Sequence, residues 1–257
     1  KVKIHKLGFN DTLTSITLDT VLIMKDSLDI NGNQGIFSIE SNIIYRAIFP
    51  SKFLSNNNRY AITIKNYNSG NEVSANSEVI SDFSFKNFNS SYKFGFYNPS
   101  LSDSSKYLSK TIQWNKSVGG QIYQLNIIFN YLEDGVLNSL VWSQPLEVFD
   151  GASMQSTIEG SKFFNFISSS LSNDTTSNLV RYFVDLDLVM TVGTENLNTY
   201  IKVNEPITGI TQQRPQFTNI TNGIGIFSSR YTHTENGIGL SNDTRDYLIN
   251  ELNRNFQ

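Results

Sequence analysis

The chain contains no cysteine, which excludes disulfide bonds, thiolate nucleophiles and cysteine-based zinc sites at once. Charged residues are also few, at 17% of the sequence against roughly 25% in an average domain. The formal net charge is −3, so no surplus of basic residues exists to neutralise phosphates, and we do not expect nucleic-acid binding. No apolar run of about 18 residues is present either, so no segment is expected to cross a membrane as a helix.

Sequence signatures of catalysis are missing too. The chain has no nucleophile elbow of the form G-x-S-x-G and no phosphate-binding loop. Gly223-Ile224-Gly225 and Gly237-Ile238-Gly239 lack the third glycine of a dinucleotide site, and their pattern favours bends or bulges. We therefore expect a protein that binds a partner, without catalytic residues, cofactor or metal.

The residues that are abundant point to β structure. Aromatic residues make up 12% of the 257 residues, with 18 Phe and 12 Tyr, and such side chains favour pleated sheets. Polar and apolar residues alternate over 60–65, a turn-rich segment follows at 66–71, and an extended pattern resumes at 72–75. The sequence thus predicts a mainly β protein.

Two long strands are predicted in the second half. Thr111–Trp114 leads through Gly119-Gly120 into a return strand, which predicts a hairpin over 110–133. Residues 180–192 predict another strand, with its even-numbered residues on one face and Arg181, Asp185 and Asp187 on the other. One face of the return strand carries Tyr123, Leu125, Ile127, Phe129 and Tyr131.

Helices are expected at three places only. Residues 156–171 have a loosely helical spacing of apolar side chains. Thr194 can cap a short helix with Glu195 in its first turn, and a final amphipathic helix is predicted to begin at Ser241 or Asn242.

A change in composition near 86–106 suggests a boundary between two domains. We expect residues 1–90 to form an immunoglobulin-like antiparallel β-sandwich. Residues 91–257 are expected to form a second, antiparallel sheet domain with a few short helices, including the C-terminal one.

Several polar residues are candidates for a site, although each has a simpler interpretation. His5 and His233 cannot make a three-histidine zinc site, and a ligand set built on His233 and Glu235 would need further partners, so a solvated histidine is the simpler interpretation. Asp185 and Asp187 have the spacing of paired acids in a glycosidase, but alternate acids more often form the wet face of a strand.

Three further segments are interpreted in the same way. Glu133-Asp134-Gly135 is typical of a turn. Residues 26–32 resemble a calcium loop only loosely, since Leu28 and Ile30 interrupt the polar residues. Tyr92, Phe94, Phe96 and Tyr97 are able to stack on a sugar or a protein, yet the alternation predicts that Phe94 and Phe96 belong to the core.

One string near the C-terminus resembles a known family. Residues 218–227 read Thr-Asn-Ile-Thr-Asn-Gly-Ile-Gly-Ile-Phe, after related stretches at 112–133 and 196–204. This string resembles the C-terminal T-N-I-x-N-G-x-G-x-F signature of uncharacterised outer-membrane lipoproteins of Bacteroidota, and the composition rich in Asn, Ser and Lys suits a Flavobacterium-like source. The firm part of the resemblance is 194–230.

The resemblance implies an immunoglobulin-like N-terminal domain and a surface-exposed protein anchored to the outer membrane by a lipid. The lipid-bearing cysteine of the family is missing here, so either it lies upstream of Lys1 or the protein is not lipidated. The implied partner is an outer-membrane protein, either a TonB-dependent receptor or a secretion or assembly channel. The family implies no catalytic residues.

The residues of the string also have a physical interpretation. Asn219 and Asn222 can turn the backbone through side-chain hydrogen bonds, Gly223 and Gly225 permit a sharp bend, and Phe227, with Ile224 and Ile226, is expected to anchor the bend to the core. These residues are therefore a candidate structural or partner-binding motif. The function predicted is an accessory subunit of an outer-membrane complex; the alternatives are a glycan- or peptide-binding module and, less favoured, a hydrolase.

Overall fold

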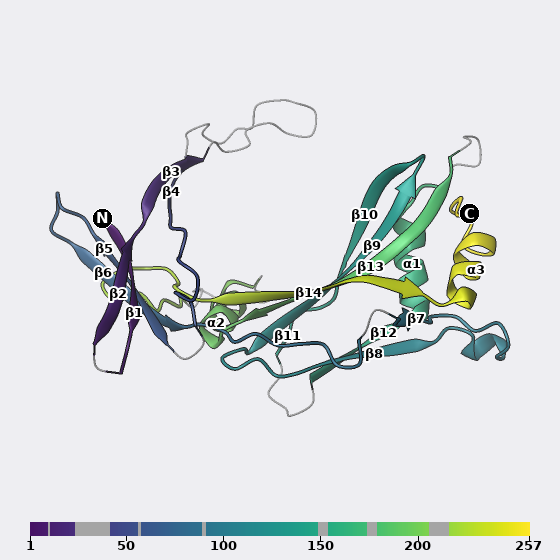
Figure 1. Ribbon diagram of the computed structural model, residues 1–257, viewed down its shortest axis with the longest axis horizontal. Helices are drawn as coiled ribbons and strands as arrows, with labels where there is room; N and C mark the ends of the chain where they lie inside the picture. Colours follow the sequence, from purple (N-terminus) through teal and green to yellow (C-terminus); the bar gives the residue numbers. More distant parts are fainter. Residues whose placement is uncertain are drawn as a thin grey trace, which may run out of the picture. The chain divides into compact units, whose positions relative to one another are not determined.

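The computed structural model describes residues 1–9, 11–23, 42–55, 58–88, 91–148, 154–173, 179–205 and 216–257. Across these residues the protein is mainly β, with several antiparallel sheets and few helices, as the sequence predicts (Figure 1). Two compact units are present. The first unit contains Lys1–Val79 and Asn196–Ser229, and the second contains Ile80–Glu195 and Arg230–Gln257. The units are therefore not the contiguous ranges 1–90 and 91–257, because 196–229 returns to the N-terminal part.

The first unit is built on a four-stranded antiparallel sheet in the order β2-β1-β5-β6. Its strands are β1 (Val2–Leu7), β2 (Thr12–Thr17), β5 (Arg59–Lys65) and β6 (Glu72–Glu78). The strand and turn predicted over 60–75 are confirmed here. Tyr60 on β5 is buried, and its hydroxyl donates a hydrogen bond of 2.7 Å to the carbonyl of Phe53.

A two-stranded antiparallel ribbon also belongs to the first unit. It consists of β3 (Asp19–Ile23) and β4 (Asn42–Arg46), which pair with each other. An immunoglobulin-like sandwich is consistent with these elements, and it remains a prediction. The loose calcium-loop resemblance at 26–32 falls outside the described residues.

The second unit contains a larger sheet and a smaller one. The larger sheet has the order β10-β9-β13-β14-β7, with β11 also pairing with β9, and only the β14–β7 pair is parallel. Its strands are β7 (Lys93–Phe94), β9 (Ile122–Glu133), β10 (Val136–Ser143), β11 (Glu147–Val148), β13 (Arg181–Gly193) and β14 (Arg230–Leu240). The smaller sheet pairs β8 (Ser109–Trp114) with β12 (Met154–Glu159).

The predicted hairpin over 110–133 is wrong in its pairing. β8 pairs with β12, whereas β9 pairs with β10 and β13. Gly119 does adopt a positive φ of 80°, but its bend does not connect two paired strands. The neighbouring Val118 N–H instead donates a hydrogen bond of 2.7 Å to the hydroxyl of Ser81. The tight hairpin forms instead at Asp134-Gly135, where both residues have positive φ angles, as the turn interpretation predicted.

The face predicted for β13 is correct only in its second half. Leu186, Leu188, Met190 and Val192 are all buried. Against β9, however, the register shifts between Phe183 and Asp185, so that one extra residue is inserted. A one-residue shift exchanges the two faces of a strand. Before this bulge Arg181 is therefore buried, and Tyr182 and Val184 are exposed.

The helices are α1 (Gly160–Ser170), α2 (Glu195–Asn204) and α3 (Asn242–Asn250), besides the short 3₁₀ helix η1 (Asp103–Ser105). Only the second part of the range 156–171 is helical, since β12 continues to Glu159. α2 begins directly after Thr194, as predicted. α3 begins after Ser241, whose hydroxyl accepts a hydrogen bond from the Thr244 N–H, as expected of an N-cap.

The core of the second unit is strongly aromatic. α1 lies beside the strands of the larger sheet (Figure 1) and buries Phe163, Phe164 and Ile167. The Phe163 ring lies 4.4 Å from that of Phe96 and 6.1 Å from that of Phe129, centroid to centroid. This cluster holds α1 against β9 and the segment that follows β7, and β9 carries residues of the candidate sites.

Candidate functional site

The Thr-Asn-Ile-x-Asn-Gly-x-Gly-x-Phe string forms a loop in the first unit that is closed by its own side chains. Asn219 accepts a hydrogen bond of 2.8 Å from the Phe227 N–H through Oδ1 and donates one of 2.7 Å to the Phe227 carbonyl through Nδ2. Thr218 Oγ1 accepts a hydrogen bond of 3.1 Å from the Gly225 N–H and donates one of 2.9 Å to its carbonyl. The two side chains thus hold the ends of the loop together.

The same loop lies against the edge of the four-stranded sheet. Thr221 and Ser74 of β6 exchange two backbone hydrogen bonds, of 2.7 and 3.3 Å. Asn222 turns the chain with a φ of +59°. A Cβ atom at Gly223 would lie 3.1 Å from a methyl group of Val73, so this position favours glycine. The motif therefore covers part of a sheet edge that would otherwise present free backbone groups.

The motif is not anchored to the core as expected. Ile224 is 88% exposed, so its predicted anchoring role is wrong. Ile226 and Phe227 are half-buried. The sequence therefore identified Asn219 as a loop-closing residue, missed Thr218 and misplaced Ile224. A role of the motif in partner binding remains a prediction.

The two acidic residues of β13 are brought together by an asparagine. Asn130 Nδ2 donates hydrogen bonds to Asp185 Oδ1 at 2.7 Å and to Asp187 Oδ2 at 2.9 Å. Asp187 Oδ1 accepts a third bond, of 3.0 Å, from the N–H of Gly237. Gly237 has a φ of +74° and sits at the register shift between β13 and β14. The carboxylates thus satisfy donors of a bulged sheet, which supports their interpretation as structural.

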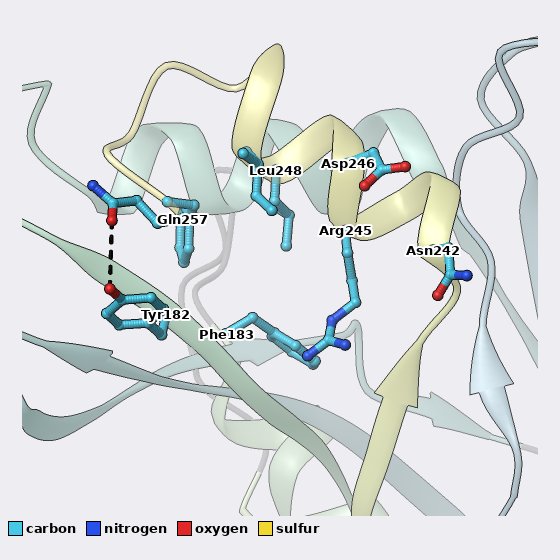
Figure 2. Close-up of a pocket in the computed structure, with 9 residues that line it drawn as sticks. Tyr182, Phe183, Asn242, Arg245, Asp246, Leu248 and Gln257 are labelled. Atoms are coloured by element: carbon cyan, nitrogen blue, oxygen red, sulfur yellow. Dashed lines mark hydrogen bonds between the residues drawn. The ribbon is translucent and has the colours of Figure 1, made fainter.

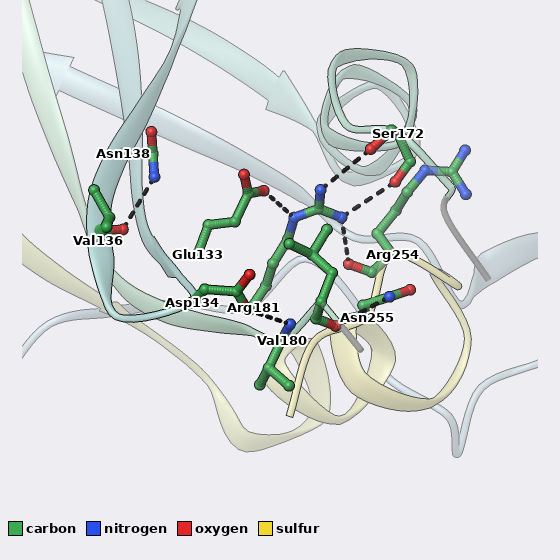
Figure 3. A network of polar contacts seen from close by, with 10 residues as sticks. Glu133, Asp134, Val136, Asn138, Ser172, Val180, Arg181, Arg254 and Asn255 are labelled. Carbon is green, nitrogen blue, oxygen red and sulfur yellow. Dashed lines mark hydrogen bonds and ion pairs between the residues drawn. The ribbon is translucent and has the colours of Figure 1, made fainter. Parts of the chain in front are cut away.

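A buried arginine lies at the centre of a polar network in the second unit (Figure 3). The side chain of Arg181 is 2% exposed, and its Nε lies 2.7 Å from Glu133 Oε2. Its Nη1 donates hydrogen bonds to the carbonyls of Arg254, at 2.9 Å, and Ser172, at 3.2 Å. The guanidinium therefore joins β9, β13, the segment after α1 and the segment after α3. Glu133, predicted only as part of a turn, is thus also the ion-pair partner of a buried arginine.

The two histidines belong to different units and have different surroundings. His5 in the first unit has both ring nitrogens bonded to hydroxyls, at 2.6 Å to Ser15 and 2.8 Å to Thr63. His233 lies on β14 in the second unit, where its ring packs 5.4 Å from that of Phe83 and its Nε2 is 3.9 Å from Glu235. Among the described residues no group of three His, Cys, Asp or Glu side chains is arranged to hold a metal ion.

The aromatic run at 92–97 divides as predicted. Phe94 and Phe96 are each 1% exposed, and their rings stack 5.2 Å apart. Tyr97 lies closer to the surface, 4.6 Å from the ring of Tyr247. Burial, together with a hydrogen bond of 2.7 Å between the Tyr247 and Tyr107 hydroxyls, raises the pKa of Tyr247 above its ordinary value.

A cavity of about 370 Å³ lies between the start of β13, α3 and the last residues of the chain (Figure 2). Phe183, Leu248 and Phe256 provide apolar walls. Arg245 projects from α3 beside Phe183, with its guanidinium carbon 5.6 Å from the ring centroid. The Tyr182 hydroxyl donates a hydrogen bond of 3.4 Å to Gln257 at the other side of the cavity. The volume falls within the range of roughly 300–1,000 Å³ seen for small-ligand sites, and polar residues, including Asp246, share the lining with the apolar ones.

The sequence did not single out Arg181 or Arg245. In the sequence, Arg181 alternates with apolar residues and is therefore expected on the solvent-exposed face of the strand. The bulge after Phe183 turns its side chain to the buried face instead. Arg245 occupies an ordinary exposed position of a terminal helix, and its neighbour Phe183 is 62 residues away in sequence. The one sequence feature that pointed to a role for Arg181 was the presence of an arginine in an otherwise apolar strand pattern.

No helix in the described part of the chain is long and apolar enough to cross a membrane. Comparison of the chain with protein-family models, with curated proteins and with solved structures finds no significant match in any of the three.

Proposed function

We propose that the protein is a non-enzymatic accessory subunit of an outer-membrane protein complex. It is held at the cell surface by a lipid anchor and bound to a TonB-dependent receptor or to a secretion or assembly channel. Two features support the proposal. The first is the resemblance of 218–227 to an outer-membrane lipoprotein signature. The second, which carries most weight, is the exposed apolar surface of the β3–β4 ribbon.

The ribbon is apolar on a face that the described residues of its unit leave exposed. Leu22 and Ile43 are direct cross-strand partners and are 66% and 60% exposed. Tyr45, two residues along the same face, is 48% exposed. Contiguous exposed apolar side chains of this kind mark interaction sites. We call the surface of Leu22, Ile43 and Tyr45 the ribbon face.

The chemistry of the ribbon favours a protein with an apolar surface as its partner. Positions 20–23 and 42–45 contain no charged residue, and the charges Asp19 and Arg46 face each other at one end. An isolated two-stranded ribbon is marginally stable in water, and packing against a further strand or layer stabilises it. A neutral β surface supplies that layer, which is why we assign the ribbon face to an integral outer-membrane protein.

Surface substitutions test this proposal. Leu22→Ser combined with Ile43→Ser removes the apolar contacts, and Leu13→Ser, at an exposed leucine of β2 in the same unit, is the matched control. Burying one leucine side chain contributes about 1.5–3 kcal/mol, so the double variant should weaken the complex at least about 100-fold.

The assay is size-exclusion chromatography of the full-length protein extracted from outer membranes. Wild type and Leu13→Ser should elute with a stoichiometric integral outer-membrane protein, and the double variant should elute without it. The proposal fails if all three proteins elute with the partner, or if the wild type elutes alone or only with a second copy of itself.

A further inference from the structure

The cavity of the second unit contains a cation with no acidic partner. Within the described residues no carboxylate forms an ion pair with Arg245, although Asp246 follows it directly on α3. Figure 2 shows the reason, since Arg245 projects toward Phe183 and Asp246 projects in a different direction from the helix. Successive residues of a helix do not face each other, so the guanidinium remains available to a ligand.

The geometry of Arg245 suits a carboxylate. Its guanidinium lies over the face of Phe183, with a distance of 5.6 Å to the centroid, and this cation–π contact restrains its orientation. A planar guanidinium presents two parallel N–H donors that match the two oxygens of a carboxylate. The aromatic ring on one side reduces the water around these donors and so strengthens the bonds that they make.

The remaining walls suit an apolar group next to that carboxylate. Leu248 is 1% exposed and Phe256 4%, so both are packed in the core behind the cavity, whereas Ile249, which also lines it, is 44% exposed and presents apolar surface. The volume of about 370 Å³ is close to the lower end of ligand pockets, which span roughly 300–1,000 Å³. The space is thus sufficient for one ring-sized apolar group.

We propose that this cavity binds a carboxylate that bears a compact apolar group, with Arg245 holding the carboxylate and Phe183 and Ile249 contacting the apolar part. Two sources share this chemistry, namely a free organic acid and the terminal carboxylate of a peptide that ends in an apolar residue. The site belongs to the second unit and is independent of the function proposed for the ribbon face.

Titration of the full-length protein with phenylacetate and phenylacetamide tests the proposal, with isothermal calorimetry for affinity and NMR shifts for location. The two probes have the same shape and differ in charge. Phenylacetate should bind about 10- to 100-fold more tightly than the amide, as expected for hydrogen bonds to charged groups. Its largest shifts should fall on Phe183, Arg245 and Ile249.

Arg245→Met keeps an apolar stem over Phe183 and removes the charge, so it should lower phenylacetate affinity by about 10- to 100-fold. Arg230→Met, at an exposed arginine outside the cavity in the same unit, should leave the affinity unchanged. Both variants should retain the wild-type melting temperature.

A third probe, the peptide Gly-Gly-Phe with a free carboxylate, separates the two sources. Tighter binding than phenylacetate assigns the site to peptide termini, and weaker binding assigns it to free acids; both outcomes support the carboxylate assignment. Equal binding of acid and amide, an unchanged affinity in Arg245→Met, or no binding of any probe up to about 10 mM would overturn it.

Discussion

Neutralising Glu133 should destabilise the second unit more than neutralising an exposed acid. Glu133→Gln removes the negative charge that lies 2.7 Å from the buried Nε of Arg181 while preserving an acceptor oxygen. Removing one partner of a fully buried ion pair costs about 3–5 kcal/mol. Because the Glu133 side chain is 33% exposed, water screens the remaining charge, and we expect a smaller loss of about 1–3 kcal/mol.

Glu159→Gln is the matched control. Glu159 forms an ion pair of 2.9 Å with Lys162, but both side chains are about half exposed or more, at 49% and 65%. Exposed pairs of this kind contribute little, so the control should change the free energy of unfolding by less than about 0.5 kcal/mol.

Tryptophan fluorescence during urea unfolding is the appropriate assay. The chain contains two tryptophans, Trp114 and Trp142, and both belong to the second unit. The signal therefore reports the unit that contains Arg181, whatever the first unit does. If Glu133→Gln and Glu159→Gln unfold at the same urea concentration, the Glu133 carboxylate does not stabilise Arg181 and the electrostatic argument is refuted.

Three other changes have defined outcomes. Gly160→Ala would place a Cβ within 3.0 Å of two backbone carbonyl oxygens, so tryptophan fluorescence should show a loss of about 1–3 kcal/mol or more. Asn219→Ala removes both hydrogen bonds to Phe227 and should cost about 1–3 kcal/mol, seen as faster amide exchange at Phe227; unchanged exchange would contradict the loop closure. The raised pKa of Tyr247, caused by burial and by the Tyr107 hydroxyl, keeps it protonated in the folded state while the unfolded state ionises near about pH 10. Stability should therefore fall as pH rises above that value, and the melting temperature of Tyr247→Phe should fall less steeply.

Local features of the fold were predictable from the sequence. The alternation of β9 from Tyr123 to Tyr131, the Asp134-Gly135 turn and the Ser241 cap of α3 each depend on residues that are neighbours in the chain. Asn219 of the 218–227 string could be assigned a turn-forming role for the same reason, because it and Phe227 are only eight residues apart.

Non-local features were not predictable. β8 pairs with β12 across about 40 residues, and nothing in Thr111–Trp114 distinguishes that partner from the nearer β9. The bulge after Phe183 reverses the faces of β13, and a one-residue insertion leaves no trace in the apolar pattern. The environment of Arg181 depends on carbonyl groups brought from Ser172 and Arg254 by the fold, so neither this network nor the cavity at Arg245 could be read from sequence.

The ribbon face has one further consequence for the arrangement of the complex. Leu22 and Ile43 belong to one face of β3–β4, and Ile23 and Ile44 belong to the other, where the exposed fractions are lower, at 45% and 37%. A partner that packs on the ribbon face should therefore protect Leu22 more than Ile23. Unequal protection of Leu22 and Ile23 would therefore distinguish specific docking on one face from non-specific hydrophobic association.

Site-specific photo-crosslinking in intact cells tests the central claim most directly. A photoreactive side chain placed at Leu22 should join the protein to one integral outer-membrane protein, identified by mass spectrometry. The same group at Ile23 should give a weaker product, and at Leu13 it should give none. Equal crosslinking from all three positions, products that contain only lipid or a second copy of the chain, or no product at Leu22 would contradict the account.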